Sequence, residues 1–438
     1  MSALLESLAA GFEQLPHRDA LGLGTARRES MDAALAGGLP TPRRERWKYT
    51  SLRALEQRRF VLPHQQDASD AEIDTVLPPA PRMVFVDGRF DAGRSDLSGL
   101  PDGVSLHALS AGLAGDDPRQ VNVLGRRWNT DDAGFWRLNA ALAVEGALLR
   151  IEQGVRVQPP LQLVFVTSAR GQDLGIHLRH RLELREGAHA TVVEHHLGHA
   201  GERPLLNSVC HVHLKPSTVL EHIRVQRAAA GASLIARTEA VLAKQATYRL
   251  LSLELGAALS RHELAIDLQG KGAHAEIRGL VRSRERQHVD TQLMLRHQLP
   301  QASSDTQWRA IAGGRSRIIF HGGILIDEGA DGSDAALETR NLLLTDTAEI
   351  DAQPVLEIHA DEVKASHGAT IGQLDDRALF YLRSRGLPEA EARRLLVFAF
   401  CRSLLEGVSD TGLQAQLERV VKQSLLPDHA ENDAEAVA

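Results

Sequence analysis

The sequence predicts a mainly β protein whose two ends are helical, and three observations support this fold class. From about residue 145 to about residue 360, segment after segment alternates apolar and polar residues with the period of two that is typical of strands. Helical periodicity occurs before residue 60 and after about residue 375. Aromatic residues make up only 4% of the chain, so we expect a core filled by aliphatic side chains.

Composition excludes several classes of protein. The 438 residues predict roughly three domains, and the net charge of −7 gives no sign of a nucleic-acid surface. Two cysteines, Cys210 and Cys401, cannot form a disulfide framework or a four-cysteine metal centre, and so few fit a reducing compartment. No apolar run of about 18 residues predicts a membrane span, and the acidic, amphipathic first 16 residues do not resemble a signal peptide. We therefore expect a cytoplasmic protein.

The N-terminal part is predicted to be helical and then mixed. Residues 1–60 have helical spacing, and their basic stretch at 42–50 contains Trp47 and Tyr49. Basic residues between aromatics can form a nucleic-acid patch, but the acidic total favours aromatics that pack inward.

A linker and a small hairpin are predicted next. Residues 64–80 are polar and end in prolines, which is typical of a linker. Residues 83–86 predict a strand, and Asp87-Gly88 predicts the turn that follows it.

The central segments predict a closed or stacked β architecture. In residues 209–214, Cys210, Val212 and Leu214 would face inward, and His211 and His213 outward. At least ten such segments occur, too many for one flat sheet with open edges. We find no fixed-length repeat and no immunoglobulin pattern, and the aliphatic interior with unevenly spaced turns leaves an irregular β-helix and a sandwich equally favoured.

The last part predicts three helices. Gly386 is suited to end the first, Pro388 to lie in the first turn of the second, and Asp410 to cap the third. The second helix and the residues after it, 395–405, are apolar around much of the circumference, which predicts burial against both the same domain and a partner. Residues 428–438 are predicted to be disordered.

Histidines are the residues that most suggest a metal site. His211 and His213 would share a strand face about 7 Å apart, and His195-His196 form a second group. A solvated strand face explains these histidines better than a metal, and His180, on an apolar face, is predicted to be a hydrogen-bonded core residue. Neither a phosphate-binding loop nor a GxSxG or HExxH motif occurs. The sequence therefore predicts a scaffold or subunit without an active site of its own.

Residues 337–407 carry a family resemblance. Its segments are Asn341-Leu-Leu-Leu, Pro354-Val-Leu-Glu-Ile, Asp361-Glu-Val-Lys, Ser366-His-Gly-Ala-Thr-Ile-Gly and Phe380-Tyr-Leu-Arg-Ser-Arg-Gly-Leu. Together they resemble the C-terminal signature of the SufB/SufD family, the core subunits of the SUF machinery for iron–sulfur cluster assembly. Glu45-Arg-Trp-Lys-Tyr-Thr resembles the SufD branch of that family, whereas SufB members are longer and richer in cysteine.

The resemblance implies an architecture and two partners. We expect a right-handed parallel β-helix at 139–368, between an N-terminal helical and mixed domain at 1–138 and a C-terminal helical domain at 369–427. It also implies pairing with SufB through the end of the β-helix and docking of the ATPase SufC on the C-terminal helices. No membrane or nucleic-acid partner is expected, and a homodimer could form when SufB is absent.

The resemblance also implies candidate residues. The SufB interface is expected to include Leu356, Ile358, Val363, Lys364 and His367. The SufC surface is expected to include Arg394, Leu395, Phe398, Phe400 and Leu404.

By the same resemblance the family's functional histidine falls on His367. This makes His367 a candidate ligand for iron, since imidazole binds iron near neutral pH. No stably bound cofactor is expected on this chain alone, but a nascent cluster could lie at the SufB–SufD interface. Many relatives have a cysteine where this chain has Ala365, which removes one thiolate. The alternative is that Ser366-His367 forms only a structural turn.

Three other functions remain open from the sequence. The chain could be a SufB-like paralogue. It could be a β-helix carbohydrate-active enzyme, although that would need a groove with carboxylates and aromatics and a secretion signal. It could also be a metal-binding module built on His195, His196, His211 and His213.

Overall fold

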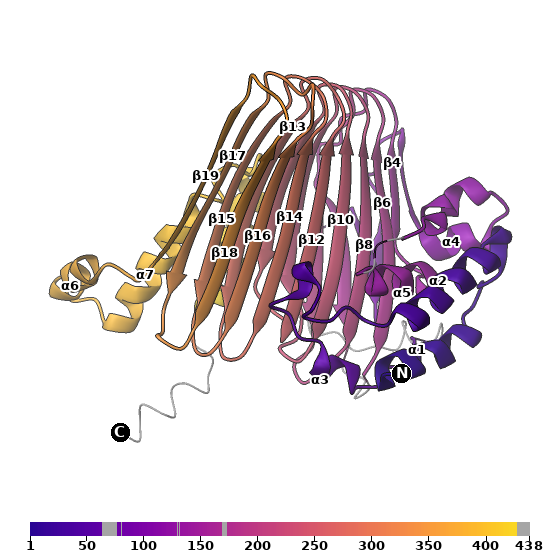
Figure 1. Cartoon of the computed structure of the whole chain (residues 1–438), viewed down its shortest axis with the longest axis horizontal. Coiled ribbons are helices and arrows are strands. Elements are labelled where there is room, and N and C mark those ends of the chain that lie inside the picture. The colour runs from indigo at the N-terminus through magenta and orange to yellow at the C-terminus, as the bar shows by residue number, and fades with distance from the viewer. Residues whose placement is uncertain (64–76, 80, 129, 131, 169–172, 427–438) are drawn as a thin grey trace.

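A β-solenoid of two facing sheets forms the body of the protein, with helices at both ends of the chain (Figure 1). The computed structural model describes residues 1–63, 77–79, 81–128, 130, 132–168 and 173–426. Most of the predicted linker at 64–80 and the whole predicted tail at 428–438 lie outside this part of the chain. Among the helices that the structure describes, none is long and apolar enough to cross a membrane.

The two sheets take alternate strands of the chain. The nine-stranded sheet consists of β3 (Val104–Ala108), β4 (Ala147–Ile151), β6 (Gly175–Leu184), β8 (Leu205–Leu214), β10 (Ser233–Leu242), β12 (Leu259–Leu268), β14 (His288–His297), β16 (Arg317–Ile326) and β18 (Glu349–Ile358). The ten-stranded sheet consists of β1 (Arg82–Val86), β2 (Arg89–Asp96), β5 (Leu161–Thr167), β7 (His189–Gly198), β9 (Val219–Arg227), β11 (Thr247–Glu254), β13 (His274–Ser283), β15 (Ser303–Ala312), β17 (Asp334–Leu343) and β19 (Lys364–Gly372).

Parallel pairing distinguishes the β-helix from the sandwich. From β4 onward every strand pairs in parallel with the strand two positions later, and the chain rises along the near sheet and descends along the far one in a right-handed path (Figure 1). Ser233 pairs with Leu259, 26 residues on, whereas Arg317 pairs with Glu349, 32 residues on. The coils therefore differ in length, which explains why the sequence shows no fixed repeat.

The interior of the solenoid is largely aliphatic, as predicted. Cys210, Val212 and Leu214 are buried in it, between the two sheets. Some aromatic rings also lie in this interior, among them Trp308 and Phe320, which stack with centroids 5.0 Å apart.

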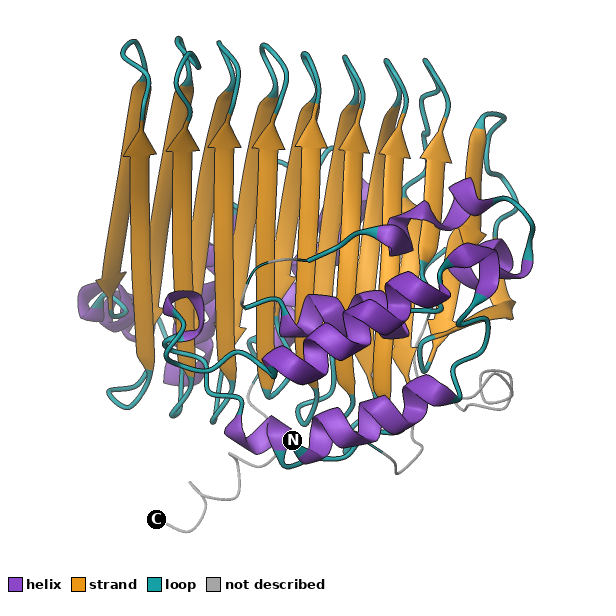
Figure 2. Cartoon of the chain, turned by 45° about the vertical axis from the view of Figure 1, so that its right-hand side comes forward, coloured by secondary structure: helices purple, strands orange, loops and turns teal. Residues whose placement is uncertain are grey.

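The N-terminal region covers part of the outer face of the nine-stranded sheet (Figure 2). Its helices are α1 (Ala3–Glu13), α2 (Gly24–Gly37), α3 (Arg53–Glu56), α4 (Leu109–Ala114) and α5 (Gly134–Leu142), with 3-10 segments η1 (Ala20–Gly22), η2 (Glu45–Trp47) and η4 (Pro118–Gly125). Trp47 is fully buried and stacks on Phe135, so the basic stretch packs its tryptophan inward as predicted. The β1–β2 turn at Asp87-Gly88 is also as predicted, and both residues have positive φ.

The C-terminal helices are α6 (Asp376–Ser384), α7 (Glu389–Arg402) and α8 (Thr411–Ser424). Apolar residues of α7 and α8 pack on the outer face of the ten-stranded sheet, whereas α6 projects beyond the last coil (Figure 1). Gly386 follows α6 with a φ of 91°, and Asp410 accepts a hydrogen bond from the backbone of Leu413, as predicted. Pro388 is the N-cap of α7, one residue before the predicted first turn.

Two predicted domain boundaries fall inside elements. The boundary after residue 138 lies in α5, and strands that precede it already extend both sheets. The boundary after residue 368 lies in β19, which continues to Gly372 because it stays paired with β17.

Candidate functional site

The solenoid ends in an open coil formed by β18 and β19. Each is the outermost strand of its sheet, so one edge of each has no neighbouring strand among the described residues. Such an edge presents free backbone N–H and C=O groups and can pair with another chain. The coil is therefore a candidate surface for a partner.

Register places His367 at an inward position of this coil. His367 lies beside Leu337 of β17, which is 2% exposed in the core of the solenoid. Likewise Ile358 lies beside Ile326 of β16, which is fully buried, yet Ile358 is 41% exposed. Both positions belong to the interior column of the solenoid, and they reach solvent because no coil follows.

The other predicted interface residues lie on the same coil. Leu356, Val363 and Ala365 are partly buried against the core, and Lys364 is exposed. The alternative that Ser366-His367 forms a turn is wrong, because both residues lie inside β19 and pair with β17. The structure thus brings the predicted interface residues together at one end.

His367 is available for binding. It is exposed, and no hydrogen bond or ion pair is formed by its side chain with the residues that the structure describes. Within that part of the chain, no three His, Cys, Asp or Glu side chains are placed to hold a metal ion. His367 therefore offers one ligand and not a complete metal site.

The predicted SufC surface divides into exposed and buried residues. Leu395 is 47% exposed, and with Arg394 and Phe398 it lines a cavity of about 360 Å³ between α7 and α8. Phe400 is partly buried, and Arg309 lies over its ring and donates to its carbonyl oxygen. Leu404 is only 2% exposed, so its prediction as a contact residue is wrong. The reason is that it follows the end of α7 and faces the ten-stranded sheet.

Two aromatic residues were missed as candidates. Phe380 and Tyr381 of α6 are 72% and 57% exposed, on the helix that projects from the body (Figure 1). Two adjacent aromatic residues in a chain with so few of them were the available signal.

The candidate metal-binding histidines are not brought together. His195 and His196 lie on β7 and His211 and His213 on β8, which belong to different sheets. His195, His196 and His211 are also buried, so the prediction of a solvated face is wrong for them, whereas His213 is exposed. The N-terminal region covers the face on which His211 lies. His180 is a buried histidine whose Nδ1 accepts from the backbone of Ala147, as predicted.

A row of buried polar side chains runs across β7, β9 and β11, three neighbouring strands of the ten-stranded sheet. Tyr248 contacts Nδ1 of His222 at 2.9 Å, and Nε2 of His222 contacts Glu194 at 3.0 Å. Glu194 also contacts His196 at 3.3 Å. Burial alone would raise the pKa of Glu194, but attraction and hydrogen bonds from the two histidines outweigh it and lower the pKa well below its usual range. These contacts give hydrogen-bond partners to polar groups that the apolar interior would otherwise leave unpaired.

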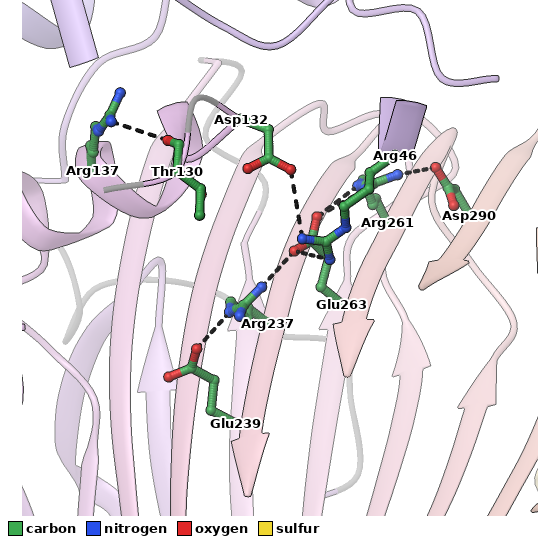
Figure 3. A network of polar contacts seen from close by, with 9 residues as sticks. All are labelled: Arg46, Thr130, Asp132, Arg137, Arg237, Glu239, Arg261, Glu263 and Asp290. Atoms are coloured by element: carbon green, nitrogen blue, oxygen red, sulfur yellow. Dashed lines mark hydrogen bonds and ion pairs between the residues drawn. The ribbon is translucent and has the colours of Figure 1, made fainter. Parts of the chain in front are cut away.

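A buried ionic network fastens the N-terminal region to the nine-stranded sheet (Figure 3). Arg46 reaches Glu263 at 3.1 Å, and Arg237 and Arg261 reach the same carboxylate at 2.7 and 2.8 Å. Burial would raise the pKa of Glu263, but the three cations outweigh it and lower the pKa. Arg261 also lies over the ring of Trp47, 3.9 Å from its centroid.

Comparison with known proteins supports the family resemblance of the sequence. The family model "SUF system FeS cluster assembly, SufBD core domain" matches residues 165–400, and "SufBD protein N-terminal region" matches residues 12–163. The iron–sulfur cluster assembly protein SufD of Escherichia coli is 32% identical over 91% of this chain and 92% of that protein. A SufBD family protein of Synechocystis is 30% identical over 87% of each chain.

A more distant relative extends the same pattern. The protein of Bacillus subtilis that is also named iron–sulfur cluster assembly protein SufD is 25% identical over 67% of this chain and 68% of its own length. With both family models matched in order along the chain, this protein belongs to the SufBD family of the SUF system for iron–sulfur cluster assembly, and it is similar to SufD.

Proposed function

We propose that this chain is a non-catalytic scaffold subunit of a cytoplasmic SUF complex, which pairs with SufB through the open coil and docks SufC on its C-terminal helices. The observation that carries the proposal is the open coil itself, whose two strands leave an edge unpaired and whose interior residues are exposed. A partner that adds a coil of its own would pair both edges and bury Ile358 and its neighbours.

The C-terminal surface suits a second partner. Leu395, Phe398 and Leu426 give it apolar area, and Arg394 and Lys422 give it charge. Phe380 and Tyr381 extend the surface along α6, and large aromatics of this kind often carry much of the binding free energy. SufC is the partner that the family resemblance implies for these helices.

His367 would serve the nascent cluster as cargo. It lies at the open end, where pairing with SufB would enclose it and exclude water. Its imidazole can supply one iron ligand or accept a proton. Because Ala365 supplies no thiolate, the remaining ligands would come from the partner or the cargo.

Two opposed substitutions test the two surfaces. The chain carrying Ile358→Asp, co-expressed with SufB and SufC, should lose SufB and keep SufC, because a carboxylate cannot be buried in the joined core. Leu395→Asp should lose SufC and keep SufB, so each variant is the control for the other. Normal capture of SufB by Ile358→Asp would disprove pairing through this coil. If the chain forms a homodimer without SufB, Ile358→Asp should also yield a monomer in size-exclusion chromatography.

The role of His367 has its own test. His367→Ala should leave the complex assembled but lower its content of iron and sulfide after reconstitution. His359→Ala is a matched control, because His359 is exposed near the same end and paired with Glu357. Normal cluster content in His367→Ala would remove the cluster-related role and leave the scaffold proposal intact.

A further inference from the structure

A cavity of about 430 Å³ lies far from both proposed partner surfaces, beside η4 on the outer face of the nine-stranded sheet. Cavities of about 300–1,000 Å³ are typical of small-molecule sites. The lining comes from η4 and the residue after it on one side, and from β6, β8 and the turn after β8 on the other. Neither the pairing of coils nor the docking of an ATPase on the C-terminal helices uses it.

The strands present four outward side chains to the cavity. Register sets Arg181 of β6 beside His211 of β8, and Glu183 beside His213. The residues between them, Leu182 among others, face the solenoid interior. Two rigid strands therefore hold the floor of the cavity.

Two cations in the lining have no carboxylate partner among the residues that the structure describes. Within that part of the chain Arg181 donates only to neutral oxygens, at 3.0 Å to Oδ1 of Asn122 and 3.4 Å to the carbonyl of Arg119, and its buried Nε has no hydrogen-bond acceptor there. Lys215, in the turn after β8, is exposed and forms no ion pair with the described residues. These two side chains are positive charges available to a ligand.

The other charged groups of the cavity are already paired. Arg126 is 2.7 Å from Glu239, and the one lining carboxylate, Glu183, is 3.1 Å from Arg185. Burial lowers the pKa of His213; Glu183 opposes this shift, and Lys215, Arg181 and Arg126 add to it. The field at the open part of the cavity is therefore positive.

His211 closes the back of the cavity in one fixed form. Arg179, which can only donate, contacts its Nε2 at 2.9 Å, so Nε2 must be the acceptor. The proton then lies on Nδ1, which is 3.3 Å from Glu239. Burial lowers the pKa of His211 to about 4, in agreement with a neutral ring. With both ring nitrogens engaged, His211 cannot ligate a metal in this arrangement.

We propose that this cavity binds the phosphate group of a small molecule, with Arg181 and Lys215 as its main donors. Guanidinium and ammonium groups bind phosphate oxygens by charge-assisted hydrogen bonds. The volume exceeds that of phosphate alone, so an organic or second phosphate group would occupy the rest. Glu183 can accept a hydrogen bond from a hydroxyl of such an organic group as well as from Arg185, because a carboxylate has two acceptor oxygens. A metal cation is disfavoured by the same positive field.

The test is calorimetric titration of the full chain with inorganic phosphate and with pyrophosphate at constant ionic strength. The wild-type chain should bind pyrophosphate with a 1:1 stoichiometry. Lys215→Met and Arg181→Met should each weaken binding about tenfold to a hundredfold, as expected for the loss of a hydrogen bond to a charged group. Lys244→Met is the matched control, because Lys244 is an exposed lysine in the turn after β10, one coil further on, outside the cavity.

The outcomes separate a site from general charge. Unchanged affinity in Lys244→Met together with the loss in Lys215→Met supports the proposal. No saturable binding of either probe to the wild-type chain overturns it, and so does an equal loss in Lys244→Met. Lys215→Met keeps the test decisive even if Arg181→Met misfolds, since Lys215 is exposed and makes no ion pair with the described residues.

Discussion

The two ends of the solenoid are finished in opposite ways. At the N-terminal end the sheets stop in antiparallel strands, with β2 against β1 and β3 against β4, and Phe85 and Leu106 fill the interior. The outer strand β2 carries charged residues, which discourage pairing with another chain. At the C-terminal end the strands remain parallel and in register to the last coil, and interior positions reach solvent.

This difference shows that a β-solenoid does not have to leave the interior positions of its last coil exposed. The same chain closes one end with a hairpin and an antiparallel strand, so it has the means to close the other. An open end that costs apolar exposure is stable in a complex if a partner covers it. The comparison therefore favours an interface at the C-terminal end. The predictions below contrast the covered part of the solenoid with its open end and its exposed surfaces.

The largest expected effect comes from the histidines of the first coils. Burial lowers the pKa of His177 to about 3 and of His180 and His195 to about 4, whereas an unfolded histidine titrates at about 6.5. The unfolded chain therefore binds more protons below pH 6.5, and the free energy of unfolding should fall as the pH drops from 6.5 to 4, by several kcal/mol in total. Urea titrations across this range would measure it. A free energy of unfolding that stays constant between pH 6.5 and 4 would contradict the prediction.

Next in size is the loss of a buried cation. Arg261→Met would leave Glu263 with fewer partners and Asp290 without its arginine, deep beneath the N-terminal region. Breaking a buried ion pair from one side costs about 3–5 kcal/mol, which a shift of the urea midpoint would report. Arg340→Met, which removes an exposed pair with Glu338, should cost less than about 1 kcal/mol. Equal effects of the two variants would show that the network does not fasten the N-terminal region.

The third prediction compares an interior position of the last covered coil with one of the open coil. Leu337→Ala, in the last covered coil, should cost about 2–5 kcal/mol. Ile358→Ala, in the open coil, should cost less in the isolated chain because its side chain is already 41% exposed. In the complex with SufB the cost of Ile358→Ala should rise. A cost that stays the same with and without SufB would contradict burial of this residue.

The smallest effect is expected on the C-terminal surface. Leu395→Ala should change the stability of the isolated chain by less than about 0.5 kcal/mol, because the residue is exposed on α7. Leu404→Ala is the contrast, since a buried leucine costs about 2–5 kcal/mol to truncate. Thermal unfolding of both variants, with SufC binding measured in parallel, would separate contact residues from core residues.

Local sequence was sufficient to predict individual strands and helix ends. Alternation at Cys210, Val212 and Leu214 predicted a strand and its inner face, because side-chain direction in a strand depends only on the period of two. Gly386 and Asp410 marked helix ends for equally local reasons, namely a positive φ and a carboxylate that accepts backbone N–H groups. The family signature at 337–407 then predicted the parallel β-helix that alternation alone left open against a sandwich.

Burial on the outer faces was decided only by tertiary structure. The alternation around His211 predicts a solvated side chain, yet the N-terminal region, far away in sequence, covers it. Leu404 and Leu395 are both leucines of the C-terminal helical region, yet Leu404 faces the ten-stranded sheet and Leu395 faces solvent. His367 is the reverse case, an interior position left uncovered by the end of the solenoid. By itself the sequence determined which side of each strand is apolar. Only the packing of distant segments decided which faces of the strands are covered and which reach solvent, because burial depends on what lies opposite a face and not on the strand itself.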